Sequence, residues 1–187
     1  MSLHYAILGF LSHRPLSGYD LKKAFDGSVR HFWPADQSQI YRTLSQLEDR
    51  QLVDKAVIEQ EERPDRKVYS ITAEGQQELV EWLRSPLPMQ DERDPFLVQV
   101  FFAGLLSNEE LLEVLAHQKA EIEGKYELLR HIYQTSSEQI QEQQAGRASL
   151  ITLLTAEHAL VIGQAYLEWL DDLMARVEND DFTPKTF

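Results

Sequence analysis

The first fifty residues place their hydrophobic side chains at the three- and four-residue intervals of an α-helix. The pattern occurs three times, and Pro15 and Pro34 interrupt it between the repeats. Ser17 and Asp36 are favourable N-cap residues at the start of the second and third repeats. The hydrophobic positions are Leu3, Ile7, Leu8 and Leu11, then Leu21, Ala24 and Phe25, then Ile40, Leu44 and Leu47. We therefore predict three short helices that share one core.

Residues 52–71 change to a pattern typical of β-strands. Two β-prone runs, residues 52–58 and 66–71, flank a polar segment at residues 59–65, which predicts a hairpin. Thr72 then stands where it can cap a fourth helix. The order of three helices, a hairpin and a helix within about 85 residues predicts a winged helix-turn-helix. In that fold the third helix enters the major groove of DNA and the hairpin flanks it.

The second half of the chain is helical by pattern. Residues 95–106 are hydrophobic nearly all round, which predicts a helix buried between the two halves of the chain or at an interface. Ser107 and Glu110 have the spacing of a capping box for the next helix. From Leu112 to Tyr133 the hydrophobic residues alternate three- and four-residue steps. This is the pattern of a coiled-coil seam, with one polar interruption at Lys119.

A polar stretch, residues 134–146, separates this helix from a last one, whose hydrophobic surface is wider than one neighbouring helix can cover. Two long helices in about 80 residues cannot bury two broad hydrophobic surfaces within one chain, so we expect self-association. The predicted fold class is mainly α, with an N-terminal winged helix-turn-helix followed by a long-helix dimerisation domain. The residues expected at the dimer interface are Leu112, Leu115, Ile122, Tyr126, Leu129, Leu160, Leu167, Leu170 and Met174.

Charge divides the chain into the same two parts. Residues 1–85 hold 11 Lys+Arg and 13 Asp+Glu, a net charge of -2, while residues 86–187 hold 7 and 18, a net charge of -11. Two prolines, Pro86 and Pro88, favour a linker at residues 85–93. We therefore place a first domain at residues 1–85 and a second at residues 86–187. The acidity of the whole chain, -13, does not exclude DNA binding by the near-neutral first domain.

The sequence contains none of the common signatures of catalysis or metal binding. The absence of cysteine excludes disulfides, thiolate zinc sites and cysteine nucleophiles. The six histidines include no pair at metal-ligand spacing, and there is no glycine-rich phosphate loop or Gly-x-Ser-x-Gly elbow. We expect no enzymatic activity, no metal and no cofactor.

The start of the chain lacks the basic region of a secretory signal, and the longest apolar runs are shorter than the roughly 20 residues that span a bilayer. We therefore expect a cytoplasmic protein without a membrane partner.

Three segments resemble the PadR family of transcriptional regulators. They read LSGYDL at residues 16–21, IYRTLSQLE at residues 40–48 and KVYSITAEG at residues 67–75. The resemblance covers residues 1–85, and the second half is similar to the virulence-activator type of C-terminal domain in one PadR subgroup. It implies a repressor that binds a pseudo-palindromic operator as a homodimer. The family usually has a glycine just after the recognition helix, and because Gln51 stands there we expect a modified helix end.

The third helix and the hairpin supply the candidate DNA contacts. Arg42 suits a phosphate or a guanine edge, Gln39 and Gln46 suit adenine or a bridging water, and Tyr41 suits a phosphate. The predicted DNA-binding residues are Ser38, Gln39, Tyr41, Arg42, Gln46, Arg63, Arg66 and Lys67. Two alternatives stay open at this point: these side chains only solvate exposed surfaces, or the winged helix docks onto another protein and binds no DNA.

Aromatic residues supply a second candidate function. The resemblance to regulators of phenolic-acid stress implies a small aromatic or hydrophobic effector in an apolar pocket. The alternative, which is the more common role of aromatic residues at helical spacing, places these side chains in the core or the dimer interface. The residues concerned are Phe32, Trp33, Phe96, Phe101, Phe102, Tyr126, Tyr166 and Trp169.

Overall fold

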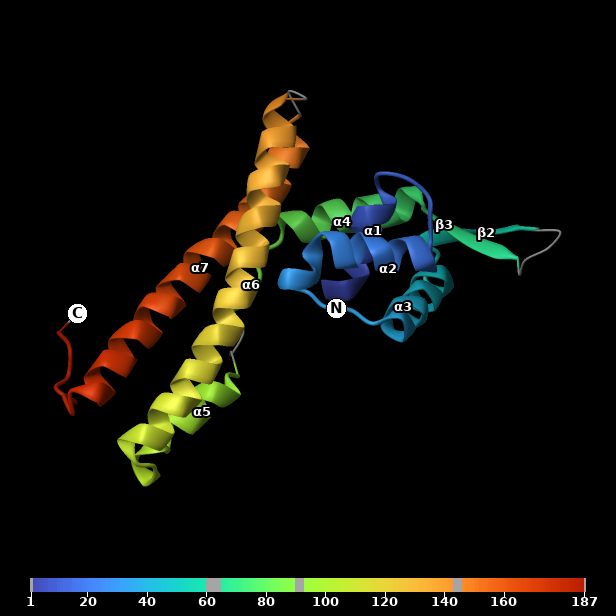
Figure 1. The fold of residues 1–187 in the computed structure, drawn as a ribbon. Coiled ribbons are helices and arrows are strands. Elements are labelled where there is room, and N and C mark those ends of the chain that lie inside the picture. Colours follow the sequence, from blue (N-terminus) through green and yellow to red (C-terminus); the bar gives the residue numbers. More distant parts are fainter. Residues whose placement is uncertain (1, 60–64, 90–92, 143–145, 187) are drawn as a thin grey trace. The chain divides into compact units, whose positions relative to one another are not determined.

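The computed structural model describes residues 2–59, 65–89, 93–142 and 146–186 of the chain (Figure 1). The chain divides into two compact units, residues 1–90 and residues 91–187. The first unit contains α1 (Ser2–Leu11), α2 (Gly18–Gly27), the 3-10 turn η1 (Val29–His31), α3 (Gln37–Asp49) and α4 (Ala73–Arg84). Its strands are β1 (Leu16–Ser17), β2 (Val53–Ile58) and β3 (Arg66–Ile71). This order of elements confirms the predicted winged helix-turn-helix.

The hydrophobic face predicted for each of the first three helices forms the core of the first unit. Ile7, Leu21, Phe25, Ile40 and Leu44 are all at most 1% exposed. Burying a side chain of this size contributes about 1.5–3 kcal/mol relative to leaving it in water. The core therefore fixes which face of α3 points inward and which is presented to solvent.

The sheet is antiparallel with the order β1-β3-β2. Strands β2 and β3 form the predicted hairpin, in register from Val53 opposite Ile71 to Ile58 opposite Arg66. Strand β1 was not predicted, because a two-residue strand has no periodicity to detect. It pairs Ser17 with Val68 and so attaches the start of α2 to the wing.

Local sequence signals set the starts of the helices. Ser17 and Asp36 cap α2 and α3 with complete capping boxes, in which the side chain at the third helical position bonds back to the cap. The hydroxyl of Thr72 accepts from the backbone N–H of Gly75 at 3.0 Å and caps α4. These three caps were predicted and are confirmed.

The expectation of a modified end to α3 is wrong. Gln51 adopts the left-handed conformation with φ 58°, the same geometry that a glycine would take there. Its N–H donates to the carbonyl of Glu48 at 2.9 Å, and the N–H of Leu52 donates to the carbonyl of Leu47 at 2.9 Å. These two bonds form a regular Schellman motif. Gln51 therefore accepts a backbone strain of about 1 kcal/mol that glycine would avoid.

Gly75 stands where the start of α4 meets the end of the α3–β2 connection. A Cβ atom built on Gly75 would lie 2.2 Å from the carbonyl oxygen of Leu52. That oxygen accepts a hydrogen bond from the N–H of Thr72 at 3.1 Å, so it cannot move away without breaking a backbone contact. Gly75 is therefore explained by the close approach of two backbone segments and not by a need for backbone flexibility.

The second unit consists of α5 (Pro95–Phe101), the 3-10 turn η2 (Ala103–Leu105), α6 (Asn108–Glu142) and α7 (Arg147–Glu178). Helices α6 and α7 lie side by side as a long hairpin (Figure 1). Helix α6 begins at the predicted Ser107–Glu110 capping box, and it continues to Glu142. The stretch at residues 134–142 is therefore a largely polar and mostly exposed extension of α6 and not the predicted separator. Its polar residues removed the hydrophobic periodicity without preventing the helix.

The hydrophobic seam of α6 packs against α7 of the same chain. Leu115 and Leu170 are fully buried and form a core cluster with Phe96 and Val177, so these two predicted dimer residues are core residues of one chain. Farther along, the ring of Tyr126 lies against Gly163, where an added Cβ would stand 3.0 Å from it. Periodicity predicted a helix with a partner, but it could not say that the partner is intramolecular.

Lys119 is the polar interruption in the predicted seam, and it has a structural partner. Its Nζ lies 2.6 Å from Oδ1 of Asp171 on α7 and 3.5 Å from Oε1 of Glu123. The Asp171 carboxylate, more than any other group, raises the pKa of the Lys119 ammonium. This cross-helix pair helps to fix the register of α6 on α7.

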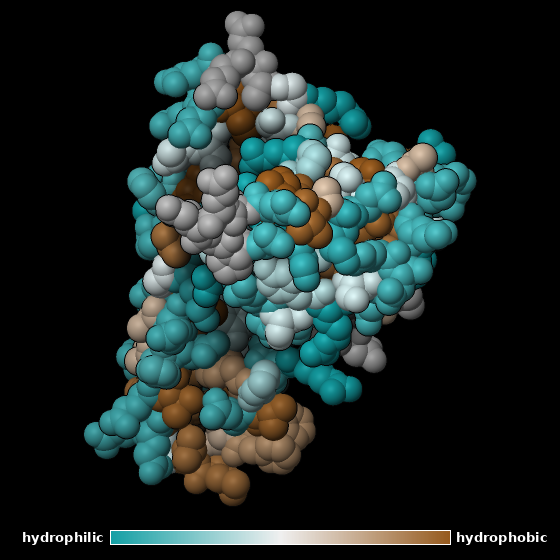
Figure 2. All heavy atoms as spheres, turned by 90° about the vertical axis from the view of Figure 1, so that its right-hand side faces the viewer, coloured by the Kyte–Doolittle hydropathy of each residue, from teal (hydrophilic) through white to brown (hydrophobic). Residues whose placement is uncertain are grey.

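The helices of the second unit leave a broad hydrophobic surface uncovered by one another. Residues 95–106 form α5 and η2 in place of one continuous helix, and Phe101 is 81% exposed and Leu105 is 89% exposed. Their burial at an interface stays a prediction. Figure 2 shows hydrophobic side chains gathered at the lower end of the molecule, where α5 lies in Figure 1. Helix α7 adds further exposed side chains: Leu150, Ile151, Leu154, Val161 and Ile162, each 45–62% exposed.

Helix α7 corrects the expectation that every apolar segment of the chain is too short to span a bilayer. By length and composition it is able to cross a membrane, with a mean hydropathy of 1.4 over its most apolar 18 residues. Unbroken apolar runs in the sequence are shorter than this helix, because polar residues such as Glu157 and His158 interrupt them.

Candidate nucleic-acid interface

Helix α3 exposes the face that carries the predicted DNA contacts. Because Ile40, Leu44 and Leu47 are fully buried, the residues between them are turned outward. The five predicted residues of this helix are all exposed, and they are Ser38, Gln39, Tyr41, Arg42 and Gln46. In Figure 2 the face of the molecule that lies on the right in Figure 1 is largely hydrophilic.

Two of these residues already have partners at the start of the helix. The hydroxyl of Ser38 donates to the Asp36 carboxylate at 2.7 Å. The amide oxygen of Gln39 accepts from the Asp36 N–H at 3.0 Å and completes the capping box. A base contact by Gln39 would therefore require the side chain to leave the cap. Local spacing from Asp36 to Gln39 could have indicated this role.

Gln46 and Tyr41 are held from outside the helix. The side-chain oxygen of Gln46 lies 3.0 Å from Nε2 of His4 on α1, a geometry in which the imidazole donates. The ring of Tyr41 packs against Gly18, where an added Cβ would stand 2.5 Å from the ring. Both contacts orient the side chains and leave them partly accessible, with Tyr41 41% exposed.

Arg42 is the cation on α3 that no acid compensates. Within the described part of the chain its guanidinium forms no ion pair. The nearest influence is on Asp36, whose pKa is lowered mainly by the Ser38 hydroxyl and only slightly by Arg42. The described residues also form no hydrogen bond with the five N–H donors of Arg42, which suit a phosphate or a guanine edge.

The wing places its predicted residues differently. Lys67 is exposed on β3 and has no ion pair in the described ranges. Arg66 is exposed as well, but its Nη2 donates to the Asp20 carboxylate on α2 at 2.6 Å. Arg63 lies outside the described residues. The contact between Asp20 and Arg66 was missed because 46 positions separate the two residues and neither belongs to a periodic pattern.

Ion pairs compensate much of the positive charge of the first unit. Lys22 pairs with Asp26, Lys55 with Glu48, and Arg50 with both carboxylate oxygens of Glu78 at 2.8 Å each. The Lys55 and Arg50 pairs secure the C-terminal end of α3 to β2 and α4. Among the described cations of this unit that form no ion pair, Arg42 lies on α3 and Lys67 on the wing, while the others, Arg14, Lys23, Arg30 and Arg84, lie elsewhere.

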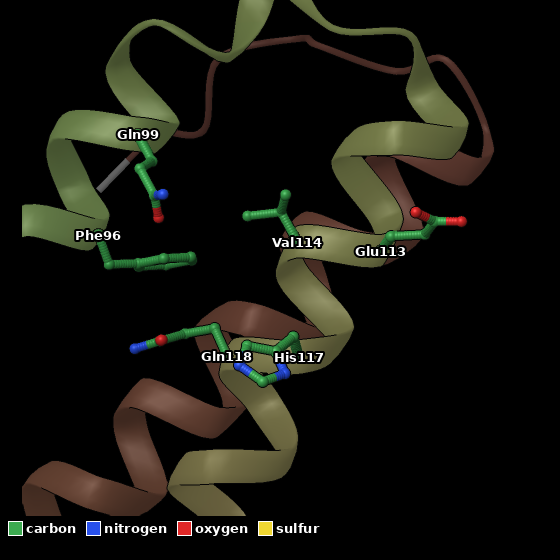
Figure 3. A pocket seen from close by; sticks show the side chains of 6 residues that line it. All are labelled: Phe96, Gln99, Glu113, Val114, His117 and Gln118. Carbon is green, nitrogen blue, oxygen red and sulfur yellow. The ribbon is translucent and has the colours of Figure 1, made fainter.

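The second unit contains a hollow between α5 and α6, with a volume of about 320 Å³. Figure 3 shows Phe96 and Gln99 on one side and Val114, His117 and Gln118 on the other, whereas Glu113 points away. This mixture of one aromatic ring with amides and an imidazole suits a small ligand with hydrogen-bonding groups.

One lining residue, Phe96, also belongs to a cluster of aromatic rings. The ring of Phe96 meets Tyr166 and Trp169 at centroid distances of 6.5 and 6.4 Å. The Tyr166 hydroxyl is buried and has no hydrogen-bond partner among the described residues. Burial raises the pKa of the Tyr166 hydroxyl. Phe101 and Phe102 do not join this cluster, since both are exposed and contact each other.

The described residues contain no group of three or more acidic or histidine side chains that could hold a metal ion.

Comparison with protein families gives two adjoining matches. Residues 7–81 match the PadR-like family of transcriptional regulators, and residues 92–178 match the virulence activator alpha C-terminal family. The chain is 29% identical over 180 residues to the negative transcriptional regulator PadR of Bacillus subtilis, covering 95% of this chain and 98% of that protein.

Solved structures give the same result over nearly the full length. The crystal structure of Bacillus subtilis PadR in complex with operator DNA is 29% identical, with a TM-score of 0.83, and 95% of this chain and 99% of that chain are covered. The complex of the same protein with p-coumaric acid gives a TM-score of 0.76 at 28% identity, covering 94% and 95%. The virulence activator AphA of Vibrio cholerae is 30% identical, with a TM-score of 0.73, covering 95% and 98%. These matches show that the chain belongs to the PadR-like family of transcriptional regulators.

Proposed function

We propose that this chain is a repressor that binds operator DNA as a homodimer through α3 and the wing. Membership in a family of transcriptional regulators confirms that the chain is a regulator and not an enzyme. The observation that carries the DNA proposal is the exposed face of α3, where Arg42 is uncompensated and Tyr41 is held beside it. The relative solved with operator DNA supports the choice of ligand. We place this activity in the cytoplasm.

Each proposed contact has a physical role. Arg42 would bind a guanine edge or a phosphate, and Lys67 would bind a phosphate beside the groove. Tyr41 would donate its hydroxyl to a phosphate and fix the register of the helix. Ser38, Gln39 and Gln46 would first exchange their present partners, so they would contribute less to affinity.

Arg42→Ala should weaken binding to the preferred operator by about 1–3 kcal/mol, because the change removes a charge-assisted contact. Lys67→Ala should weaken binding to DNA of any sequence about equally. It should also reduce the magnitude of the slope of log K against log[salt] by about 1. The operator is first selected from a random duplex library with the wild-type protein. Binding is then titrated by fluorescence anisotropy at several salt concentrations.

Arg84→Ala is the matched control. Arg84 is an exposed cation at the end of α4 with no ion pair in the described chain. It carries the same charge as Arg42 and lies outside the proposed interface, so its loss should change neither specificity nor the salt slope by a comparable amount. Equal effects of all three substitutions would show that only net charge matters and would overturn the assignment.

The homodimer proposal rests on the surface that one chain leaves uncovered. Leu150, Leu154 and Val161 lie within about 40° of one another around α7, and they are 51%, 57% and 62% exposed. Ile122, Tyr126, Leu129, Leu160, Leu167 and Met174 are half-buried, so they would contribute at the margin of such a surface, as would Leu112. An exposed hydrophobic stripe of this length is typical of a protein–protein interface. In a two-fold dimer, the same stripe of a second copy would bury it.

A two-fold dimer would also serve recognition. It would present two α3 helices to half-sites about one helical turn apart, which matches a pseudo-palindromic operator. The coverage of α7 by a second chain would remove the need for a lipid environment, in agreement with the expectation of no membrane partner.

We also infer a small aromatic effector. The relative solved with p-coumaric acid supports this class of ligand, and the hollow beside Phe96 offers one place in the chain for a ring and its polar groups. Saturating p-coumaric acid, at about 100 times its Kd, should stabilise the protein by about 2.7 kcal/mol and release it from DNA. Differential scanning fluorimetry and the anisotropy titration measure the two effects. Cinnamic acid, which lacks the phenolic hydroxyl, is the control, and no stabilisation by either acid at millimolar concentration would contradict the inference.

A further inference from the structure

The first turn of α2 connects the two elements of the proposed DNA surface. Tyr41 of α3 packs its ring against Gly18, and Arg66 of β3 donates to the Asp20 carboxylate. Strand β1 stabilises this arrangement, because Ser17 pairs with β3 immediately before the helix starts. A residue of α2 therefore holds an arginine of the wing.

One carboxylate oxygen of Asp20 accepts three contacts. Its Oδ2 accepts from Nη2 of Arg66 at 2.6 Å, from the Ser17 hydroxyl at 2.6 Å and from the Ser17 N–H at 3.3 Å. The Ser17 hydroxyl, followed by Arg66, holds the pKa of Asp20 below its ordinary value. The contact is therefore present at neutral pH and is lost only when the pH falls through that lowered pKa. At neutral pH the pair carries no net charge.

Building on the proposed function, we propose that Asp20 is a specificity-determining residue, which orients Arg66 and cancels its long-range attraction for phosphate. The side chain of Arg66 is still 49% exposed. Its Nε and Nη1 groups form no hydrogen bond within the described residues, so they can donate to a correctly placed acceptor. Non-specific binding depends on uncompensated charge, whereas a directed hydrogen bond depends on position. The pair therefore favours the cognate site over other DNA.

The surroundings make this role distinct from that of the other cations. Arg42 and Lys67 form no ion pair in the described ranges, so they attract any phosphate backbone. Arg66 stands next to Lys67 in the wing and would otherwise add to that attraction.

Asp20→Asn tests the proposal, because asparagine has nearly the same shape and keeps an acceptor for Ser17. We expect tighter binding to a non-operator duplex of random sequence, with a slope of log K against log[salt] steeper by about 0.9. Between 50 and 200 mM salt that slope corresponds to an additional loss of affinity of about 3.5-fold. Affinity for the site selected by the wild-type protein should rise less, so the ratio of specific to non-specific affinity should fall.

Three further variants make the result decisive. Asp26→Asn removes the same charge from the same helix and releases Lys22, and it should leave the slope unchanged. Arg66→Gln should abolish the effect of Asp20→Asn when the two are combined. Ser17→Ala weakens the cap and keeps the Asp20 charge, so it should lower the melting temperature without changing the slope.

An unchanged slope in Asp20→Asn, or a change that persists in the Arg66→Gln background, would overturn the role of Asp20. If the wild-type protein selected no sequence and its DNA binding did not depend on salt, the proposed function itself would fail. The two outcomes are therefore distinguishable.

Discussion

A Gly75→Ala variant should lose about 2–3 kcal/mol of the free energy of unfolding of the first unit, a cost typical of overpacking. The added Cβ would stand 2.2 Å from the Leu52 carbonyl oxygen, well inside van der Waals contact. Relief requires the start of α4 to move, which stretches the bond from Thr72 to the same oxygen. For a unit of this size the loss corresponds to a fall in melting temperature of about 10–20 °C. Thermal and urea unfolding followed by circular dichroism measure it.

Gly9→Ala is the control for this change. Gly9 lies inside α1, and a Cβ there meets nothing within 4 Å. Alanine should therefore stabilise the same unit by about 0.5–1 kcal/mol through its higher helix propensity. If Gly75→Ala were as stable as Gly9→Ala, the close approach of Leu52 would not explain the glycine.

The double substitution Leu154→Glu with Val161→Glu should convert the proposed dimer to a monomer. These residues lie seven positions apart on one face of α7, and each is more than half exposed in a single chain. Because each of the two chains carries both substitutions, the interface of a two-fold dimer would contain four carboxylates. No cation faces them in the proposed interface to compensate for the cost of removing them from water. Sedimentation velocity at micromolar concentration should show the mass of one chain. Operator affinity should fall by at least about 100-fold, since the avidity of two linked contacts is lost.

The matched control adds the same charge to polar positions of the same helix. Thr152→Glu with Thr155→Glu places two glutamates at exposed, polar sites of α7 that lie at least about 100° around the helix from Leu154 and Val161. This variant should remain a dimer and keep most of its operator affinity. A dimer that persisted with glutamate at positions 154 and 161 would move the interface elsewhere, for example to the exposed end of α5.

The parts of the fold that depend on near neighbours could be predicted from the sequence. The inward face of α3 follows from Ile40, Leu44 and Leu47, because a spacing of three and four residues brings them to one side. Ser17 and Thr72 indicate where α2 and α4 begin. This signal is also local, because the cap side chain accepts from a backbone N–H three residues away.

The parts that depend on distant neighbours could not be predicted. The seam through Leu115 looked equally suited to a second chain and to α7, because periodicity reveals a hydrophobic face and not its cover. Arg66 appeared to be a free cation until the fold brought Asp20 to it. Gln39 shows the opposite case: its place in the capping box follows from its distance of three residues from Asp36, whereas its contact with DNA stays a prediction.

The burial of Leu115 and Leu170 inside one chain has a consequence for how such a regulator would respond to its own abundance. Each subunit keeps a core of its own, so separation of the proposed dimer need not unfold either copy. Assembly would then be a reversible equilibrium between folded subunits. At concentrations below the dimer dissociation constant, operator occupancy would rise with the square of protein concentration, giving a sharper threshold of repression than an inseparable dimer provides.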